Sequence, residues 1–487
     1  MLFNSYEFIF VFLPVTLVIY FYLNHKRLPE ASKGFLVFSS LFFYSWWNIA
    51  YLPLILSSML FNYVVGKLLS KEDALKRQFS KKSILIFGVL LNLLLLAYFK
   101  YSDFFIENLN YSFESNIDLL NLALPLAISF FTFQQISYLV DSYRQETHEY
   151  DFLNYALFVT FFPQLIAGPI VHHKEMMPQF ANIRNKVKNY RNISMGIFVF
   201  SLGLFKKVVI ADSFATCANV GFDSASVLNL IEAWVVSLSY TFQLYFDFSG
   251  YTDMAVGLAL MFNIKLPLNF NSPYKAINIQ DFWRRWHITL GRFLKDYIYI
   301  PLGGNRKGEF RTYNNLMATF VIGGIWHGAG WTFVFWGLLH GLALVLHRAW
   351  SKLGFKMWSW LAWLITFNFV NVAWVFFRAK TWDDAVKILG SMFGFDNIIL
   401  PAPLAGKLSF LGQYGVKFGG FLADIQGDNI TIIWLLAGFI LVLSFKNSIE
   451  KLDNFKLNYR TVLLSTVSFS CGVLFLNKVS EFLYFNF

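Results

Sequence analysis

Two histidines stand in apolar surroundings where an ionisable side chain is costly. His327 follows the run NLMATFVIGGIW and precedes GAGWTFVFWGLL, and His287 lies in QDFWRRWHITLGRFLKDYIYIPLGGNR at residues 280–306. Burial disfavours imidazolium, so both rings are expected to be neutral and able to accept a proton. Acyl transfer to a hydroxyl needs such a base and a donor to the developing oxyanion. An ionisable residue at hydrocarbon depth is a functional-site hypothesis, with simple helix packing as the alternative.

Glycines surround His327 in the sequence. Gly323 and Gly324 precede it, and Gly328 and Gly330 follow it. Glycine lets a backbone bend or be approached closely, and irregular backbone at membrane depth survives only beside protein or a water-filled cavity. The pattern therefore predicts a cavity next to His327.

The segment around His287 has the pattern of a basic amphipathic helix. At helical spacing one face carries apolar residues together with the histidine: Trp283, His287, Leu290 and Leu294. The more polar faces carry the cations: Arg284, Arg285, Arg292 and Lys295. The basic side suits either the membrane headgroup region or a phosphate-bearing ligand. An interfacial anchor without a ligand is the alternative.

Other chemistries are excluded or disfavoured. Four other histidines lie in loops or at run ends and are expected to be solvated or interfacial: His25, His148, His172 and His173. His347, followed by Arg348 near the end of its run, is expected at the interface, and His340 lies in the same apolar run without an assigned role. No serine nucleophile elbow and no nucleotide P-loop accompany the two apolar histidines. Only Cys217 and Cys471 are present, both in apolar segments, which disfavours a disulfide framework and a cysteine zinc site. No metal or bound cofactor is therefore predicted.

The elements that must position these residues are membrane helices. Hydrophobic residues make up 56% of the 487-residue chain and charged residues only 14%, against roughly a quarter charged in soluble domains. Apolar runs of spanning or near-spanning length recur from residue 7 to residue 478. About ten to twelve crossings are expected at ~20 residues each. The predicted fold is all-α and polytopic, with re-entrant or interfacial helices.

Loop charge sets the expected orientation. Basic loops at 24–33, 70–82, 183–191, 305–311 and 446–456 are predicted to be cytoplasmic. Residues 102–118 contain no Lys or Arg and should face outward, as should the Gly- and Pro-containing region 392–430, expected to be partly ordered. Topology thus accounts for the net charge of +11 better than nucleic-acid binding does.

The chain resembles the membrane-bound O-acyltransferases of the bacterial alginate O-acetylation type. Six ordered blocks carry the resemblance: ISFFTFQQISYLVDSYR (128–144), FPQLIAGPI (162–170), GLFKKVVIAD (203–212), FQLYFDFSGYTDMAVG (242–257), DFWRRWHITLGRFLKDYIYIPLGGNR (281–306) and WHGAGWTFVFWGLLHG (326–341). Ala127 stands where this family commonly has glycine. The resemblance implies one membrane domain over 1–487, with a motif-bearing core at about 120–350 and a central funnel.

The same resemblance implies the site. His327 of the WHG motif and His287 of RRWH would be the catalytic pair, acting on acetyl-CoA as donor. Bulky Trp326 favours a short acyl group. The residues expected to bind donor or substrate are Trp326, Arg284, Arg285, Arg292, Lys295 and Asn305, and those expected to support the site are Tyr245, Asp247, Tyr251 and Asp253.

Partners and location follow from the resemblance as well. The protein would lie in the bacterial inner membrane and work with a periplasmic acetyltransferase on alginate, peptidoglycan or another envelope polysaccharide. Two alternatives remain open at this point. One is a proton-coupled transporter or channel, although the chain lacks the internal repeat common in transporters. The other is a lipid O-acyltransferase of the same superfamily.

Overall fold

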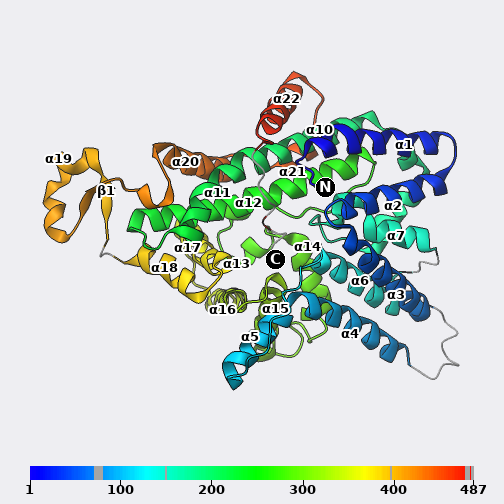
Figure 1. Cartoon of the computed structure of the whole chain (residues 1–487), viewed down its shortest axis with the longest axis horizontal. Helices are drawn as coiled ribbons and strands as arrows, with labels where there is room; N and C mark the ends of the chain where they lie inside the picture. Colours follow the sequence, from blue (N-terminus) through cyan, green and yellow to red (C-terminus); the bar gives the residue numbers. More distant parts are fainter. Residues whose placement is uncertain (71–79, 148–150, 395–396, 478–482, 484–487) are drawn as a thin grey trace. The chain divides into compact units, whose positions relative to one another are not determined.

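The structure is a computed structural model that describes residues 1–70, 80–147, 151–394, 397–477 and 483 (Figure 1). The described residues are mostly helical and contain two strands of three residues each. This confirms the all-α prediction. Packing divides the chain into two compact units, one of Met1–Leu204, Tyr251–Leu268 and Leu452–Asn486, the other mainly of Phe205–Gly250 and Asn269–Lys451.

The first unit contains the N-terminal helices. These are α1 (Leu13–His25), α2 (Pro29–Ser45), α3 (Leu52–Ser70), α4 (Lys81–Lys100), α5 (Ser102–Phe113), α6 (Ile128–Tyr143), α7 (Phe152–Thr160), α8 (Phe162–Leu165), α9 (His173–Ala181), nearly all of α10 (Tyr190–Phe205) and α22 (Tyr459–Leu474). Asn62 of α3 and Asn92 of α4 exchange side-chain hydrogen bonds of 3.1 and 2.7 Å. Such polar pairs hold helices together where lipid supplies no hydrophobic driving force.

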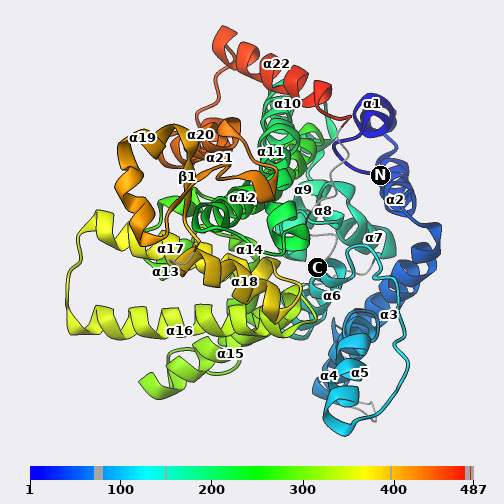
Figure 2. The same cartoon turned by 60° about the vertical axis from the view of Figure 1, so that its left-hand side comes forward.

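The second unit contains the segments with the candidate histidines (Figure 2). Its helices are α11 (Asp212–Asn219), α12 (Leu230–Met261) as far as Gly250, α13 (Ile279–Trp283), α14 (Ile288–Leu294), α15 (Glu309–His327), α16 (Trp331–Leu353), α17 (Ser359–Arg378), α18 (Trp382–Phe393), α19 (Ala405–Leu408), α20 (Asn429–Ser444) and most of α21 (Ser448–Asp453). Both views show α15 and α16 side by side.

Six stretches of described helix are long and apolar enough to cross a bilayer. They are Phe8–His25, Ile49–Ser70, Lys81–Lys100, Tyr190–Ser224, Trp331–Leu353 and Ser359–Arg378, with mean hydropathies of 1.3 to 2.1. Two shorter apolar helices, Asn429–Ser444 and Tyr459–Leu474, add to them. The protein is therefore a polytopic membrane protein, while ten to twelve crossings stays a prediction.

Local sequence signals fix several helix ends. Side chains of Thr381, Asp428 and Asn458 form capping boxes at the starts of α18, α20 and α22, where they satisfy backbone N–H groups that have no helical partner. Ala127, just before α6, has a φ of 60°. This left-handed conformation is unstrained for glycine but costly for alanine, which explains why a glycine would suit the position.

The region expected to be a partly ordered outward loop has short regular elements. Strands β1 (Ile399–Pro401) and β2 (Lys417–Gly419) pair in parallel, and α19 lies in the connection between them. The carboxylate of Glu232 on α12 accepts a hydrogen bond of 2.9 Å from the backbone N–H of Asp424. This contact ties the end of the region to the helical part of the second unit.

Candidate active site

His287 lies at a break in the helix that its sequence predicts. Helix α13 ends at Trp283 and α14 begins at Ile288, and His287 between them has a φ of 44°. The prediction of one continuous amphipathic helix is therefore wrong. The break is fixed from a distance, because the backbone N–H of Ile288 donates to the carbonyl of Asn269 at 2.9 Å. Its consequence is that His287 leaves the face shared by Trp283 and Leu294.

Asn269 sets the tautomer of the fully buried His287. Its Oδ1 accepts hydrogen bonds from Thr289 Oγ1 at 2.9 Å and from the Thr289 backbone N–H at 3.3 Å, so this atom is the oxygen of the amide. His287 Nδ1, 3.0 Å from the same oxygen, must then carry the proton. Burial lowers the pKa of His287 to about 3. The ring is therefore neutral at physiological pH, with its Nε2 lone pair as an acceptor.

An aromatic cluster joins His287 to His327. The Trp326 ring lies with its centroid 6.4 Å from that of His287 and 4.9 Å from that of His327. His327 is also in contact with Trp336 and Phe377, at centroid distances of 5.2 and 5.1 Å. Both imidazoles are buried, His327 with only 3% of its surface exposed. The two predicted catalytic residues thus share one apolar, aromatic environment.

The glycines near His327 serve close packing. A Cβ on Gly324 would lie 2.3 Å from the carbonyl oxygen of Phe333, and one on Gly337 would lie 2.4 Å from that of Phe320. The backbones of α15 and α16 therefore touch at these two positions. A Cβ on Gly328 would meet the Phe333 ring at 2.1 Å. The prediction that these glycines open a cavity is wrong for Gly324 and Gly328, since α16 fills the space.

A cavity of about 880 Å³ lies among α13, α14, α15 and α16. Its cationic lining comes from Arg284, Arg292, Lys295, Arg348 and Lys352, and its apolar walls include Trp283, Ile288, Leu294, Phe320 and Leu344. Asn305 and His347 also line it. Such a lining matches a ligand that has phosphates at one end and an apolar or neutral chain at the other.

Glu309 organises part of the cationic lining. Its carboxylate accepts hydrogen bonds of 3.0 and 3.1 Å from Arg348 and lies 2.8 Å from Lys352 Nζ. These two cations lower the pKa of Glu309 to about 2. The carboxylate is therefore ionised at any physiological pH, and it holds the side chains of Arg348 and Lys352, both of which line the cavity.

Ring contacts through Trp283 and Trp336 connect the cavity lining to His327. The Trp283 indole lines the cavity and donates from Nε1 to His340 Nδ1 at 3.2 Å. Its ring centroid is 5.8 Å from that of Trp336, which in turn contacts His327. His340 is fully buried on α16. Two indole rings and a buried histidine thus lie next to one another between the cavity lining and His327 in this series of contacts.

The structure groups only some of the predicted binding residues. Arg284, Arg292, Lys295 and Asn305 line the cavity. Arg285 instead pairs with Asp281 at 2.8 Å and donates to the Asn271 carbonyl. Trp326 contacts the two histidines and does not line this cavity.

The predicted supporting residues fall in different places. Asp247 pairs with the buried Lys207 Nζ at 2.6 Å, and Asp212 lies 3.3 Å from the same nitrogen. Tyr245 contacts Trp286 at a centroid distance of 6.3 Å. Tyr251 and Asp253 are buried in the first compact unit. Support of the histidines by these four residues stays a prediction.

Several histidines differ from expectation. His172 and His173 are buried, with 7% and 6% of their surface exposed, and His172 Nδ1 lies 3.4 Å from Asp141 Oδ2. The prediction that they are solvated or interfacial is therefore wrong, because the chain around α8 packs inside its unit. His148 lies outside the described residues. The role of His340 as acceptor for Trp283 could not be predicted from local spacing, because that contact joins residues far apart in the chain.

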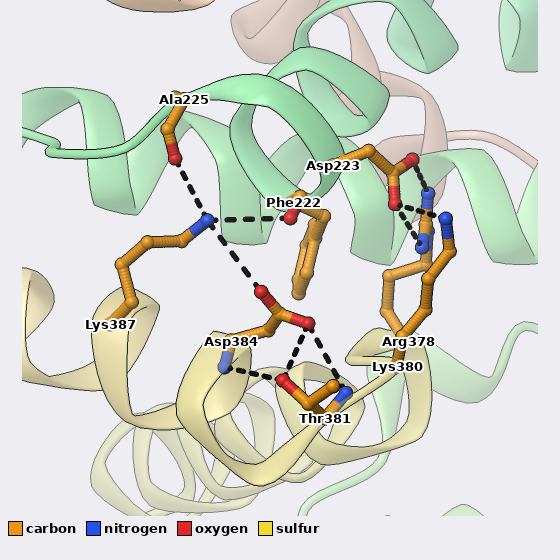
Figure 3. Close-up of polar contacts among 8 residues, drawn as sticks. All are labelled: Phe222, Asp223, Ala225, Arg378, Lys380, Thr381, Asp384 and Lys387. Carbon is orange, nitrogen blue, oxygen red and sulfur yellow. Dashed lines mark hydrogen bonds and ion pairs between the residues drawn. The ribbon is translucent and has the colours of Figure 1, made fainter.

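A polar network anchors the segment that follows Phe377 (Figure 3). The Arg378 guanidinium donates to both Asp223 oxygens and lies 5.3 Å from the Phe222 ring centroid. Lys387 of α18 donates to the carbonyls of Phe222 and Ala225 at 3.3 and 2.9 Å. The network ties the end of α17 to residues 222–225, and thereby positions Phe377 against His327.

Comparison with known proteins identifies the family. The model of the membrane-bound O-acyltransferase family (MBOAT) matches residues 10–381. The chain belongs to this family. It is 50% identical to a peptidoglycan O-acetyltransferase of Helicobacter pylori, over 100% of this chain and 98% of that protein. It is 40% identical to a probable alginate O-acetylase AlgI of Pseudomonas aeruginosa, over 92% and 82% of the two chains.

A more distant relative has a related activity. The teichoic acid D-alanyltransferase of Bacillus subtilis is 27% identical over 53% of this chain and 70% of its own length. The protein is thus a membrane O-acyltransferase, as the sequence motifs predict. Family membership favours acyl transfer over the transporter that the sequence left open.

Proposed function

We propose that this O-acyltransferase takes an acetyl group from cytosolic acetyl-CoA and delivers it to a hydroxyl on the outer side of the membrane for O-acetylation of peptidoglycan. The observation that carries the proposal is the cavity of about 880 Å³, which is lined both by cationic side chains and by apolar side chains that include Trp283. The full-length relative from H. pylori supports peptidoglycan as the acceptor.

The donor would bind with its phosphates near Arg292 and Lys295, which line the cavity together with Arg284. Guanidinium groups bind phosphate oxygens through directed, charge-assisted hydrogen bonds. The basic loop 305–311, which leads into the helix carrying Glu309, supports a cytoplasmic position for this end of the cavity. The thioester would then extend past Trp283 toward His327.

The two histidines would divide the proton chemistry. His327 would remove the proton of the acceptor hydroxyl as its oxygen attacks the thioester carbonyl. The C–O bond forms, the C–S bond breaks, and the departing thiolate takes the proton to give free CoA. His287 Nε2 would accept a hydrogen bond from a second hydroxyl of the acceptor and so orient it. The neutral His287 ring has a single N–H, at Nδ1, and donates it to Asn269. His287 therefore has no N–H that could donate a hydrogen bond to an oxyanion.

An indole supplies a candidate donor to the oxyanion. Trp336 Nε1 is buried and has no hydrogen-bond partner among the residues that the structure describes. Its ring lies beside that of His327, at a centroid distance of 5.2 Å. A preorganised N–H in a water-excluded site is worth much more to a developing oxyanion than it would be in water. We assign this N–H to the thioester oxygen.

Two further parts of the proposal concern the protein's surroundings. The protein would act in the bacterial inner membrane, with the basic loops on the cytoplasmic side. A periplasmic acetyltransferase would move acetyl from the outer side of this protein to the polymer.

The test is acetyl transfer by the purified protein in proteoliposomes, with [14C]acetyl-CoA as donor and peptidoglycan strands plus a periplasmic extract as acceptor system. We expect labelled ester on peptidoglycan and no more than background with His327→Ala. Labelled ester that forms preferentially on alginate would identify alginate, and not peptidoglycan, as the acceptor. If unlabelled long-chain acyl-CoA competes with [14C]acetyl-CoA better than unlabelled acetyl-CoA does, lipid O-acylation is favoured instead.

The donor site has its own matched test. Arg292→Gln should raise the KM for acetyl-CoA about ten-fold or more, since a hydrogen bond to a charged group contributes roughly 1.5–3 kcal/mol. Arg311→Gln removes an exposed cation on α15 that is not among the cavity-lining residues. It should leave KM unchanged. An equal rise in both variants would indicate a general charge effect and contradict the donor site.

A further inference from the structure

A second cavity, of about 730 Å³, lies in the first compact unit beside the end of α1. It is lined by residues of α1 and the turn after it, and by the segment 183–188. Three of the lining residues are long cations: Arg27, Lys186 and Lys188. These three cations belong to the basic loops 24–33 and 183–191, which are predicted to be cytoplasmic. None of the lining residues belongs to the candidate active site.

The polar side of this cavity is cationic. The ion pairs among the described residues do not include Arg27, Lys186 or Lys188. Glu30, the nearest acidic residue in sequence to Arg27, pairs with Lys33 at 3.0 Å. Asn24 satisfies its own amide by bonding to Tyr20 and Ser32. Within the part of the chain that the structure describes, the cavity lining is therefore positively charged and contains no acidic residue.

The other side of the cavity is apolar and continuous with a membrane span. Val18 and Tyr22 lie on the span Phe8–His25, and 64% and 56% of their surfaces are exposed. Ile183 and Val187 complete the wall from the opposite segment, and both are largely exposed. Exposed apolar surface on a spanning helix faces acyl chains, and the end of such a helix lies at the level of the headgroups.

We propose that this cavity binds an anionic phospholipid of the cytoplasmic leaflet. Its phosphate would lie among Arg27, Lys186 and Lys188, and an acyl chain would follow Val18 and Tyr22 along α1. A free phosphate ester would use the same cations, but it would leave the apolar wall uncovered. The anionic cytoplasmic leaflet provides such lipids next to juxtamembrane cations.

The experiment titrates short-chain phosphatidylglycerol into the full-length protein in neutral detergent, with phosphatidylcholine and glycerol phosphate as comparison ligands. Each cation near an anionic surface contributes roughly a five-fold change in affinity. The triple variant Arg27→Gln, Lys186→Gln, Lys188→Gln should therefore bind phosphatidylglycerol about a hundred-fold more weakly. Phosphatidylcholine should bind the wild-type protein and the triple variant alike.

The matched control neutralises three neighbouring cations outside the cavity lining: Lys26→Gln, Arg184→Gln, Arg191→Gln. It has the same net charge as the triple variant and should bind phosphatidylglycerol like the wild-type protein. The charge-keeping variant Arg27→Lys, Lys186→Arg, Lys188→Arg should also bind, which separates lost recognition from lost folding. Equal weakening in the control, or glycerol phosphate binding as tightly as the lipid, would overturn the proposal.

Discussion

The contact between α15 and α16 makes a sharp prediction about Gly324. A Cβ at this position would lie 2.3 Å from the Phe333 carbonyl oxygen and 3.1 Å from Gly337 Cα. Because real Cβ contacts essentially never fall under 3.0 Å, Gly324→Ala must push the two backbones about 0.7 Å apart. Both contacting groups are backbone, so no side-chain rotation can relieve the overlap.

The magnitude follows from this displacement. His327 ends α15 and Trp336 lies on α16, so separation of the helices moves the proposed base away from the proposed oxyanion donor. Misplacement by about 1 Å can cost 10²-fold in rate, and overpacking typically costs 1–3 kcal/mol of stability. We expect Gly324→Ala to lower kcat about ten- to a hundred-fold in the proteoliposome assay, with a smaller effect on the KM for acetyl-CoA.

The neighbouring glycine supplies the control. A Cβ on Gly323 would meet only Leu294 Cδ1, at 3.2 Å, and this side-chain end can move. Both substitutions raise helix propensity by the same amount, about 1 kcal/mol. Gly323→Ala should therefore keep kcat within about two-fold of the wild-type value. Folded Gly324→Ala protein that is as active as folded Gly323→Ala protein would show that the helices tolerate this Cβ without moving the site.

Three other predictions follow from particular residues. Trp336→Phe keeps an aromatic ring but removes the indole N–H, so kcat should fall about 10²–10³-fold with KM unchanged. The control is Trp374→Phe, which makes the same change at another buried and unpartnered indole N–H among the described residues. Equal losses in the two variants would argue against a specific donor. Because burial holds the pKa of His287 at about 3, against about 6.5 when unfolded, the unfolded state binds more protons between these values. The free energy of unfolding should therefore decrease as the pH falls through that window, and His287 should not affect its pH dependence above the window. The measurement compares the free energy of unfolding of His287→Gln and the wild-type protein over pH 4–8. Parallel pH dependences of the two proteins would contradict the prediction. Ala127→Gly should raise the free energy of unfolding, measured by denaturant titration, by about 0.5–1 kcal/mol, because φ is 60° at this position. A lower free energy of unfolding in the variant would show that packing of the alanine side chain contributes more than the backbone conformation costs.

The sequence predicts those features that depend on composition and local spacing. Hydropathy identifies the polytopic helical fold, and the motifs place His287 and His327 near one another, where Trp326 contacts both rings. The cations of 284–295 also point to a phosphate-binding surface, and Arg284, Arg292 and Lys295 do line one cavity.

Features that depend on long-range contacts were not predictable in this way. The periodicity of the sequence predicts a continuous helix through His287. The helix breaks there because the backbone and side chain of Asn269, 18 residues earlier, form hydrogen bonds with Ile288 and His287. Local spacing contains no information about these contacts. Glycine spacing near His327 indicates close approach, but whether backbone or open space lies opposite depends on α16. Arg348 and Lys352 join the cavity only because α16 returns beside Glu309.

Sidedness of transfer tests the central claim most directly. In proteoliposomes of one known orientation, [14C]acetyl-CoA is supplied only on the side of the basic loops and the acceptor system only on the other. The proposed mechanism predicts labelled acceptor in this arrangement, little label when the two compartments are exchanged, and background label with His327→Ala. Transfer that requires donor and acceptor in the same compartment, or that persists in folded His327→Ala protein, would contradict it.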